Sequence, residues 1–201
     1  MPTGITEKKR VWDFPTRAFH WALVATVCVG WYLGEYRSFS TIALHFYFGY
    51  AVGALLVFRI IWGFMGAPAS RWHALSLRPR QVLGYARTLP TRSPSSYDGH
   101  NPLGALAVVT MILVLAGLVS TGLFAEDDTM WAEGPFANWL PSDWTVTVTA
   151  YHSYFSRAVL VLVLIHVAAV LFYWIWKNEN LIKPMITGWK SVRTSSSTPN
   201  Q

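Results

Sequence analysis

Charged residues are scarce in this chain. Only 13% of its 201 residues are Asp, Glu, Lys or Arg, whereas 53% are hydrophobic. Because soluble domains average about 25% charged residues, the composition argues against a soluble protein. The net charge of +6 would suggest nucleic-acid binding in a soluble protein. The positions of these charges favour a lipid bilayer instead, and no nucleic acid is expected as a partner.

Cysteine is almost absent. The single cysteine, Cys28, lies inside an apolar run. One cysteine excludes an internal disulfide and a cysteine-based zinc site, and c-type haem attachment needs a Cys-x-x-Cys-His motif. The sequence contains no such motif, so c-type attachment is excluded as well.

Long apolar runs dominate what is present. A bilayer-spanning helix needs about 20 predominantly apolar residues, and four runs are long enough, at residues 18–36, 42–65, 103–124 and 151–176. The sequence therefore predicts an all-α protein, an integral membrane four-helix bundle formed by one domain over residues 1–190. The Ser/Thr-rich residues 191–201 are predicted to form a disordered tail.

The charges between these runs predict the orientation. Lys and Arg are concentrated in the N-terminal segment, in the connection between the second and third runs, and in the tail. The connection between the third and fourth runs is acidic and contains no Lys or Arg. By the positive-inside rule, four spans place both termini in the cytoplasm and the acidic connection outside. The first run is not expected to be a signal peptide, since no small-residue cleavage site follows it.

Four histidines lie in or at the ends of the predicted spans. They are His20, His45, His152 and His166, while His73 and His100 fall in the basic connection and are expected at the surface. Ionisable side chains inside a membrane are costly and usually functional. The alternative is that these four only form hydrogen bonds between helices or lie among the lipid headgroups.

Helix geometry sorts the four histidines into two pairs. His152 and His166 share one helix face and lie about 21 Å apart along the axis. By depth, His166 matches His20 near the cytoplasm (the inner pair), and His152 matches His45 on the other side (the outer pair). Haem iron takes axial ligands from opposite faces, which facing helices supply, whereas zinc needs a cluster at one depth. The spacing therefore predicts two haems stacked in the core, each with two histidine ligands.

Arginines and glycines near these positions fit the same interpretation. Arg59 follows His45 by 14 residues on the same face, and Arg17 precedes His20 by three. Both are predicted to contact inner-haem propionates, and Arg157 an outer-haem propionate, because guanidinium groups suit carboxylates. Snorkelling to headgroups is the alternative for Arg59. Small residues are expected to allow close approach of helices or of a macrocycle, namely Gly49, Gly53, Gly104 and Gly117.

Several segments resemble the bacterial cytochrome b561 and Ni-Fe-hydrogenase-type cytochrome b family. The similarity extends from about Val11 to Lys190, and the opening motif is its most specific part. The similar segments are Val11–Trp21 (VWDFPTRAFHW), His45–Tyr50 (HFYFGY), Arg59–Gly63 (RIIWG), Asn101–Gly104 (NPLG), His166–Val170 and Asn180–Gly188 (NLIKPMITG).

The resemblance implies a bacterial inner-membrane protein that carries two b-type haems on the four histidines named above. It also implies electron exchange with quinone and with a redox partner such as a periplasmic c-type cytochrome. One alternative is a cytochrome b subunit that anchors a larger, hydrogenase-like oxidoreductase, although no docking segment is recognisable. Another is a haem-free membrane scaffold. Whether the protein is an enzyme in its own right or an electron carrier is left open by the sequence.

Overall fold

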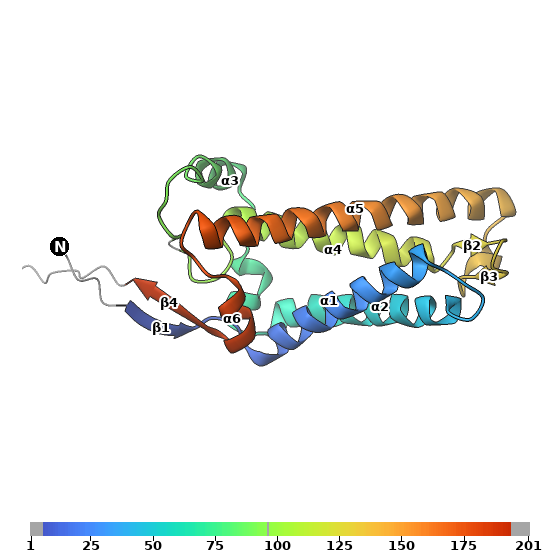
Figure 1. Ribbon diagram of the computed structural model, residues 1–201, viewed down its shortest axis with the longest axis horizontal. Coiled ribbons are helices and arrows are strands. Elements are labelled where there is room, and N and C mark those ends of the chain that lie inside the picture. The colour runs from blue at the N-terminus through green and yellow to red at the C-terminus, as the bar shows by residue number, and fades with distance from the viewer. Residues whose placement is uncertain (1–5, 96, 194–201) are drawn as a thin grey trace, which may run out of the picture. The chain divides into compact units, whose positions relative to one another are not determined.

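The computed structural model describes residues 6–95 and 97–193, which are mostly helical (Figure 1). The described residues form two compact units: residues 18–62 with 107–167, and residues 6–17 with 63–95, 97–106 and 168–193. The elements are β1 (Thr6–Arg10), α1 (Phe14–Glu35), α2 (Ile42–Met65), η1 (Pro68–Ser70), η2 (Trp72–Ala74), α3 (Pro79–Ala86), α4 (Pro102–Gly122), β2 (Glu126–Asp127), β3 (Ala132–Glu133), η3 (Ala137–Trp139), α5 (Ser142–Ile175), α6 (Ile182–Thr187) and β4 (Trp189–Arg193).

The first unit, called here the helical unit, contains most of α1, α2, α4 and α5 and the hairpin β2–β3. Side chains from all four helices meet in one core, in which Val52, Leu56, Leu115 and Val159 are buried. Most other large apolar side chains of these helices remain exposed, as Leu113 and Leu164 do. An exposed apolar surface of this extent is expected of helices that face lipid.

Among the described residues, three helices are long and apolar enough to cross a membrane: α2, α4 and α5. They coincide with three of the four predicted spans. The first helix, α1, has 22 residues but is less apolar, since it carries His20, Trp21, Trp31 and Tyr32. Its crossing therefore stays a prediction.

Proline and capping residues set helix starts that the apolar runs do not mark. Pro15 and Pro102 occupy the first turns of α1 and α4, where a missing N–H costs nothing. The Asn101 side chain caps α4 by accepting a hydrogen bond from the Gly104 N–H at 2.8 Å. Pro141 precedes α5, which begins nine residues before the predicted span because its Thr-rich first turns are helical but not apolar.

The second unit, called here the basic unit, is held by a short sheet and by buried polar contacts. Strands β1 and β4 pair antiparallel, with Arg10 opposite Trp189 (Figure 1). The buried Glu179 carboxylate accepts hydrogen bonds from Ser95 and lies 2.8 Å from the Lys190 ammonium. The strand β4 reaches Arg193, so the predicted disordered tail begins inside it; residues 194–201 lie outside the described part.

A buried hydroxyl pair links α3 to the end of α5 within the basic unit. The Tyr85 and Tyr173 hydroxyls are 2.8 Å apart, and the Asn101 amide donates to Tyr173 at 3.0 Å. Burial and the hydrogen bond to Tyr173 raise the pKa of Tyr85 well above its ordinary range, so this hydroxyl stays protonated at physiological pH.

Two sequence expectations for the basic connection are wrong. His73 is exposed as expected, but His100 is half-buried, with its ring 4.8 Å from that of Trp12. In residues 71–85, the positions of Trp72, Leu75, Leu77 and Leu83 also predict an amphipathic surface helix, yet α3 starts only at Pro79, and Tyr85 is buried. The reason is that a residue before proline avoids the helical region: Arg78 is extended, with ψ 123°.

Replacing Leu115 with alanine tests the core of the helical unit. Leu115 is 1% exposed among the core side chains, so Leu115→Ala should lower the free energy of unfolding by about 2–5 kcal/mol. Leu113 on the same helix is 66% exposed, and Leu113→Ala should change it by no more than about 0.5 kcal/mol. Denaturant titration in detergent measures both, and equal effects would contradict this core.

Candidate haem-binding site

The four histidines of the predicted spans lie in the helical unit and meet in two pairs. The ring centroids of His45 and His152 are 6.1 Å apart, and those of His20 and His166 are 6.3 Å apart. These are the outer and inner pairs that matching by depth predicts. Because α5 carries one member of each pair, the pairs are separated by about 21 Å along that helix.

The spacing within each pair leaves room for one metal ion between the rings. A metal–imidazole bond is about 2.0 Å long, and a ring nitrogen lies about 1.1 Å from the centre of a ring with C–N bonds near 1.33 Å. Two rings bound to one metal ion on opposite sides therefore have centres about 6 Å apart. Among the described residues, no group of three or more His, Cys, Asp or Glu side chains could hold a metal ion. Pairs of histidines are the donor set that haem iron uses, since the porphyrin supplies the other ligands.

The rings of the outer pair are fixed by backbone carbonyls of neighbouring helices. The Nδ1 atom of His45 lies 2.9 Å from the Gly30 carbonyl oxygen on α1, and that of His152 lies 3.0 Å from the Leu118 carbonyl oxygen on α4. A carbonyl oxygen only accepts hydrogen bonds, so both Nδ1 atoms donate. Both Nε2 atoms then carry a free lone pair, which is the state that a metal ligand needs.

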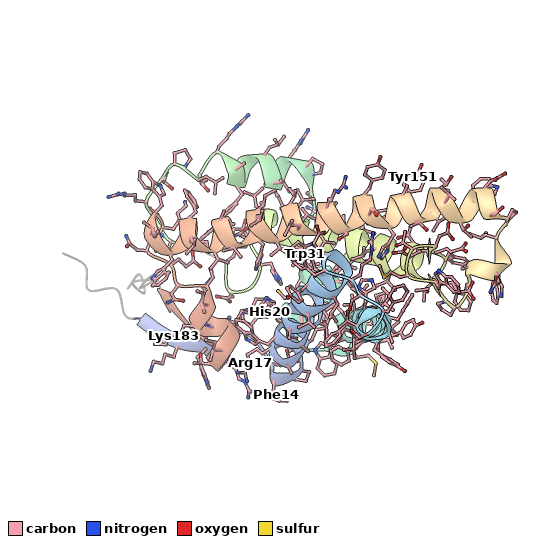
Figure 2. All side chains as sticks on the ribbon, turned by 45° about the vertical axis from the view of Figure 1, so that its right-hand side comes forward. Phe14, Arg17, His20, Trp31, Tyr151 and Lys183 are labelled. Carbon is pink, nitrogen blue, oxygen red and sulfur yellow. The ribbon has the colours of Figure 1, made fainter. Side chains whose placement is uncertain are left out.

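The inner pair has a different environment. His20 projects from the first half of α1 (Figure 2), and its ring packs edge-on against Trp21 at 5.1 Å. Its Nδ1 atom is buried and has no hydrogen-bond partner among the described residues. The neighbouring Phe19 lies 6.1 Å from Phe58 of α2, which brings the α2 segment next to Arg59 to the level of His20.

The three candidate arginines have different surroundings. Arg59 is 5% exposed, and a buried guanidinium within a membrane helix requires an anionic or polar partner. Arg17 lies in the basic unit, where its guanidinium donates to the Ile186 carbonyl oxygen. Arg157 is exposed and lies about 140° around α5 from His152. That placement favours snorkelling to headgroups near the exposed Tyr154, so contact with a propionate stays a prediction.

The glycines singled out from the sequence divide between packing and open space. A Cβ added at Gly117 would lie 2.5 Å from the Phe155 ring, and one at Gly53 would lie 3.3 Å from Val119. These two therefore allow helices to pack closely. At Gly49, one turn after His45, an added Cβ would meet nothing within 4 Å, which leaves space beside the outer pair. Gly104 belongs to the capped first turn of α4.

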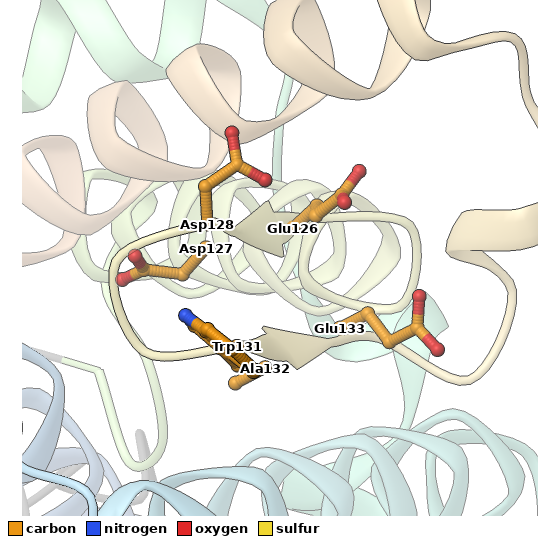
Figure 3. Close-up of a pocket in the computed structure, with 6 residues that line it drawn as sticks. All are labelled: Glu126, Asp127, Asp128, Trp131, Ala132 and Glu133. Carbon is orange, nitrogen blue, oxygen red and sulfur yellow. The ribbon is translucent and has the colours of Figure 1, made fainter.

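An acidic hairpin, residues 125–134, is fastened beside the outer pair. The Glu126 N–H donates to the Thr149 hydroxyl, one turn before His152 on α5, and that hydroxyl donates to the Glu126 carbonyl oxygen. A Cβ added at Gly134 would lie 2.6 Å from the Gly122 carbonyl oxygen, at the end of α4. Figure 3 shows the pocket on this hairpin, lined by Glu126, Asp127, Asp128, Trp131, Ala132 and Glu133.

Membrane helices that bring histidines into facing pairs at two depths define the class of b-type membrane cytochromes. Comparison with known families agrees: a profile described as prokaryotic cytochrome b561 matches residues 11–188. The chain belongs to this family. Proteins of this family are integral membrane b-type cytochromes that transfer electrons, so membership implies that the chain binds b-type haem.

Several similar proteins match nearly the whole chain. A probable Ni/Fe-hydrogenase B-type cytochrome subunit of Azotobacter vinelandii is 27% identical, over 91% of this chain and 88% of its own length. A protein of the same name from Bradyrhizobium diazoefficiens is 25% identical, over 91% of this chain and 86% of its own length. Another, from Rhizobium leguminosarum bv. viciae, is 23% identical, over 89% of this chain and 87% of its own length. No solved structure matches the chain.

Two glycines that contact the outer histidines do not stand out in the sequence. Gly34 on α1 touches the His45 ring, and Gly122 on α4 touches the His152 ring. Each glycine lies four residues after the residue whose carbonyl oxygen accepts a hydrogen bond from the same ring: Gly34 after Gly30, and Gly122 after Leu118. The pair Gly30 and Gly34 is a signal of close approach by a partner, but only the structure identifies the partner as an imidazole.

Asp127 gives a pH-dependent test of how the hairpin is fastened. Burial raises its pKa, but hydrogen bonds from Thr129 and the Arg37 guanidinium, 3.0 Å away, outweigh burial and leave the pKa of Asp127 lowered. Because the folded pKa is lowered, the contact stabilises the fold above the unfolded value of about 3.9. The stabilisation is lost as pH falls through the lower, folded pKa.

We expect Arg37→Gln to raise the pKa of Asp127, as measured by NMR of carboxyl-labelled aspartate. Arg157→Gln removes an exposed arginine of α5 and should leave the pKa unchanged. A pKa of Asp127 that is the same in the wild type and in Arg37→Gln would show that the ion pair does not hold the hairpin.

Proposed function

We propose that this chain carries two b-type haems, one between His45 and His152 and one between His20 and His166, and passes electrons across the membrane. The observation that supports this most strongly is the pair of facing imidazole contacts at 6.1 and 6.3 Å in the helical unit. When bound, haem supplies reversible one-electron chemistry. Two histidines would hold each iron and leave it no open position, which suits electron transfer rather than oxygen binding.

The chain's own side chains orient and tune these sites. Carbonyl hydrogen bonds at Nδ1 hold the outer imidazoles in the tautomer that presents Nε2. The buried Arg59 supplies positive charge at the level of His20 and suits an inner-haem propionate. Arg17, three residues before His20, is the second candidate for that role. The apolar core between the pairs excludes water.

The orientation proposed is that of a bacterial inner-membrane protein with both termini in the cytoplasm. Lys and Arg flank the helices at the termini and in the basic connection, whereas the connection between α4 and α5 is acidic. This orientation puts the inner pair near the cytoplasm and the outer pair, with the acidic hairpin, near the periplasm. Electrons would then pass between the quinone pool and a redox partner on the periplasmic side.

The acidic hairpin supports a basic periplasmic redox protein, such as a c-type cytochrome, as that partner. Glu126, Asp128 and Glu133 surround Trp131, which is 91% exposed and has a positive φ of 49°. Opposite charges steer such partners together, and an exposed tryptophan is a common anchor at protein interfaces. The hairpin also lies beside the histidines that would hold the outer haem.

A second candidate function is the membrane cytochrome b subunit of a larger oxidoreductase. It is favoured by the names of the relatives, which are probable Ni/Fe-hydrogenase B-type cytochrome subunits. In this case the same haem pairs conduct electrons between the attached enzyme and quinone. Purification from native membranes distinguishes the two: a stoichiometric catalytic partner supports the subunit, and a lone cytochrome that reduces soluble c-type cytochrome supports the carrier.

Histidine variants test the ligand assignment. Each of His20→Ala, His45→Ala, His152→Ala and His166→Ala should lower the haem content from about two to about one per chain, since iron loses one of its two axial ligands. Haem per chain is measured by the pyridine haemochrome method. The matched control is His73→Ala, at an exposed position of the basic connection, which should retain both haems.

A colourless wild-type protein, produced with ample haem, would contradict the haem assignment and favour a haem-free scaffold. Retention of both haems in all four variants would contradict the ligand set alone.

Neutralising the hairpin tests the periplasmic partner. Combining Glu126→Gln, Asp128→Asn and Glu133→Gln should slow association with a purified basic c-type cytochrome about 10-fold at low salt. The difference should shrink as ionic strength rises. Stopped-flow kinetics measures it, with Glu35→Gln, an exposed acid outside the hairpin, as control. An association rate that changes neither in the triple variant nor with ionic strength would rule out docking on this surface.

A further inference from the structure

We propose that Gly34 and Gly122 are positioning residues for the outer haem, because each completes a brace that fixes the ring of one outer histidine. The inference rests on the proposed ligand role of His45 and His152. It adds that two residues on two other helices, neither able to bind iron, determine how these imidazoles face the metal.

Each brace consists of a carbonyl oxygen and a glycine one helical turn apart. On α1, the Gly30 carbonyl accepts from His45 Nδ1 at 2.9 Å, and a Cβ added at Gly34 would lie 2.7 Å from His45 Cε1. Residues four apart share one helix face. The ring of His45 is therefore held at Nδ1 by the carbonyl and packs flush against the bare backbone of the glycine.

The same arrangement recurs on a different pair of helices. On α4, the Leu118 carbonyl accepts from His152 Nδ1 at 3.0 Å, and a Cβ added at Gly122 would lie 2.9 Å from His152 Cε1 and 3.1 Å from Nδ1. Both histidines of the pair thus meet a carbonyl at one position and a glycine four residues later. Glycine is required because any larger residue displaces the ring from the carbonyl.

The brace is confined to the outer pair. His20 Nδ1 is buried without a hydrogen-bond partner among the described residues, and none of the described helix glycines has His20 or His166 among the nearest atoms to its added Cβ. The outer imidazoles are therefore oriented before haem binds. Donation from Nδ1 to a carbonyl raises the basicity of Nε2, which favours ferric iron and lowers the midpoint potential of the outer haem.

Gly34→Ala and Gly122→Ala test the brace. Alanine is the stronger helix former, so loss of helix is not the expected effect. Each variant should shift the low-spin ferric EPR signal of the outer haem and raise its midpoint potential, or lose that haem altogether. The inner haem should keep its signal and potential. The outer signal is identified as the one that His152→Ala removes.

The control is Gly84→Ala on α3, where an added Cβ meets nothing within 4 Å and both haems should remain unchanged. Unaltered EPR signals and potentials in both brace variants would overturn the inference. So would equal loss of both haems, which would indicate a general packing role. If the wild type binds no haem, or His45→Ala and His152→Ala retain the outer haem, the proposed function itself has failed.

Discussion

The arrangement depends on one helix, α5, which contributes an imidazole to both histidine pairs. Fourteen residues separate His152 from His166, so the two rings share a face but lie about 21 Å apart in depth. The other helices must then bring His45 and His20 to those two depths. The core of Val52, Leu56, Leu115 and Val159 packs α2, α4 and α5 in the interval between the pairs, where it both fixes the helices and keeps water out.

The two histidine pairs have chemically different surroundings, so the two ends of the bundle are not equivalent. The outer imidazoles donate to carbonyls, and the acidic hairpin is fastened beside them through Thr149. In the inner pair, the buried Nδ1 of His20 has no hydrogen-bond partner within the described part of the chain, and a buried guanidinium, Arg59, lies on the helix beside it. Positive charge stabilises reduced haem, whereas a more basic ligand stabilises oxidised haem. If haem binds as proposed, both differences would raise the potential of the inner haem relative to that of the outer haem.

The sequence is enough to predict which histidines pair, but not where the helices that carry them start or which glycines contact their rings. Pairing by depth needs only the helix rise and the order of the apolar runs, so His20 with His166 and His45 with His152 follow from spacing alone. The starts of α3 and α5 depend on Pro79 and Pro141 rather than on apolar content. The roles of Gly34 and Gly122 depend on contacts between helices that no local pattern encodes. Likewise, the exposure of Arg157 follows from how α5 packs against the other helices, which the sequence alone does not give.

The most direct measurement is the haem content and reduced-minus-oxidised spectrum of the purified protein in mild detergent. The facing pairs predict about two haems per chain, with a low-spin b-type spectrum from both, because in the proposed assignment each iron would have two imidazole ligands. A single haem per chain would show that one of the two pairs is not a ligand set. Absence of haem, after production with an ample supply of it, would contradict the account and leave only the helical fold.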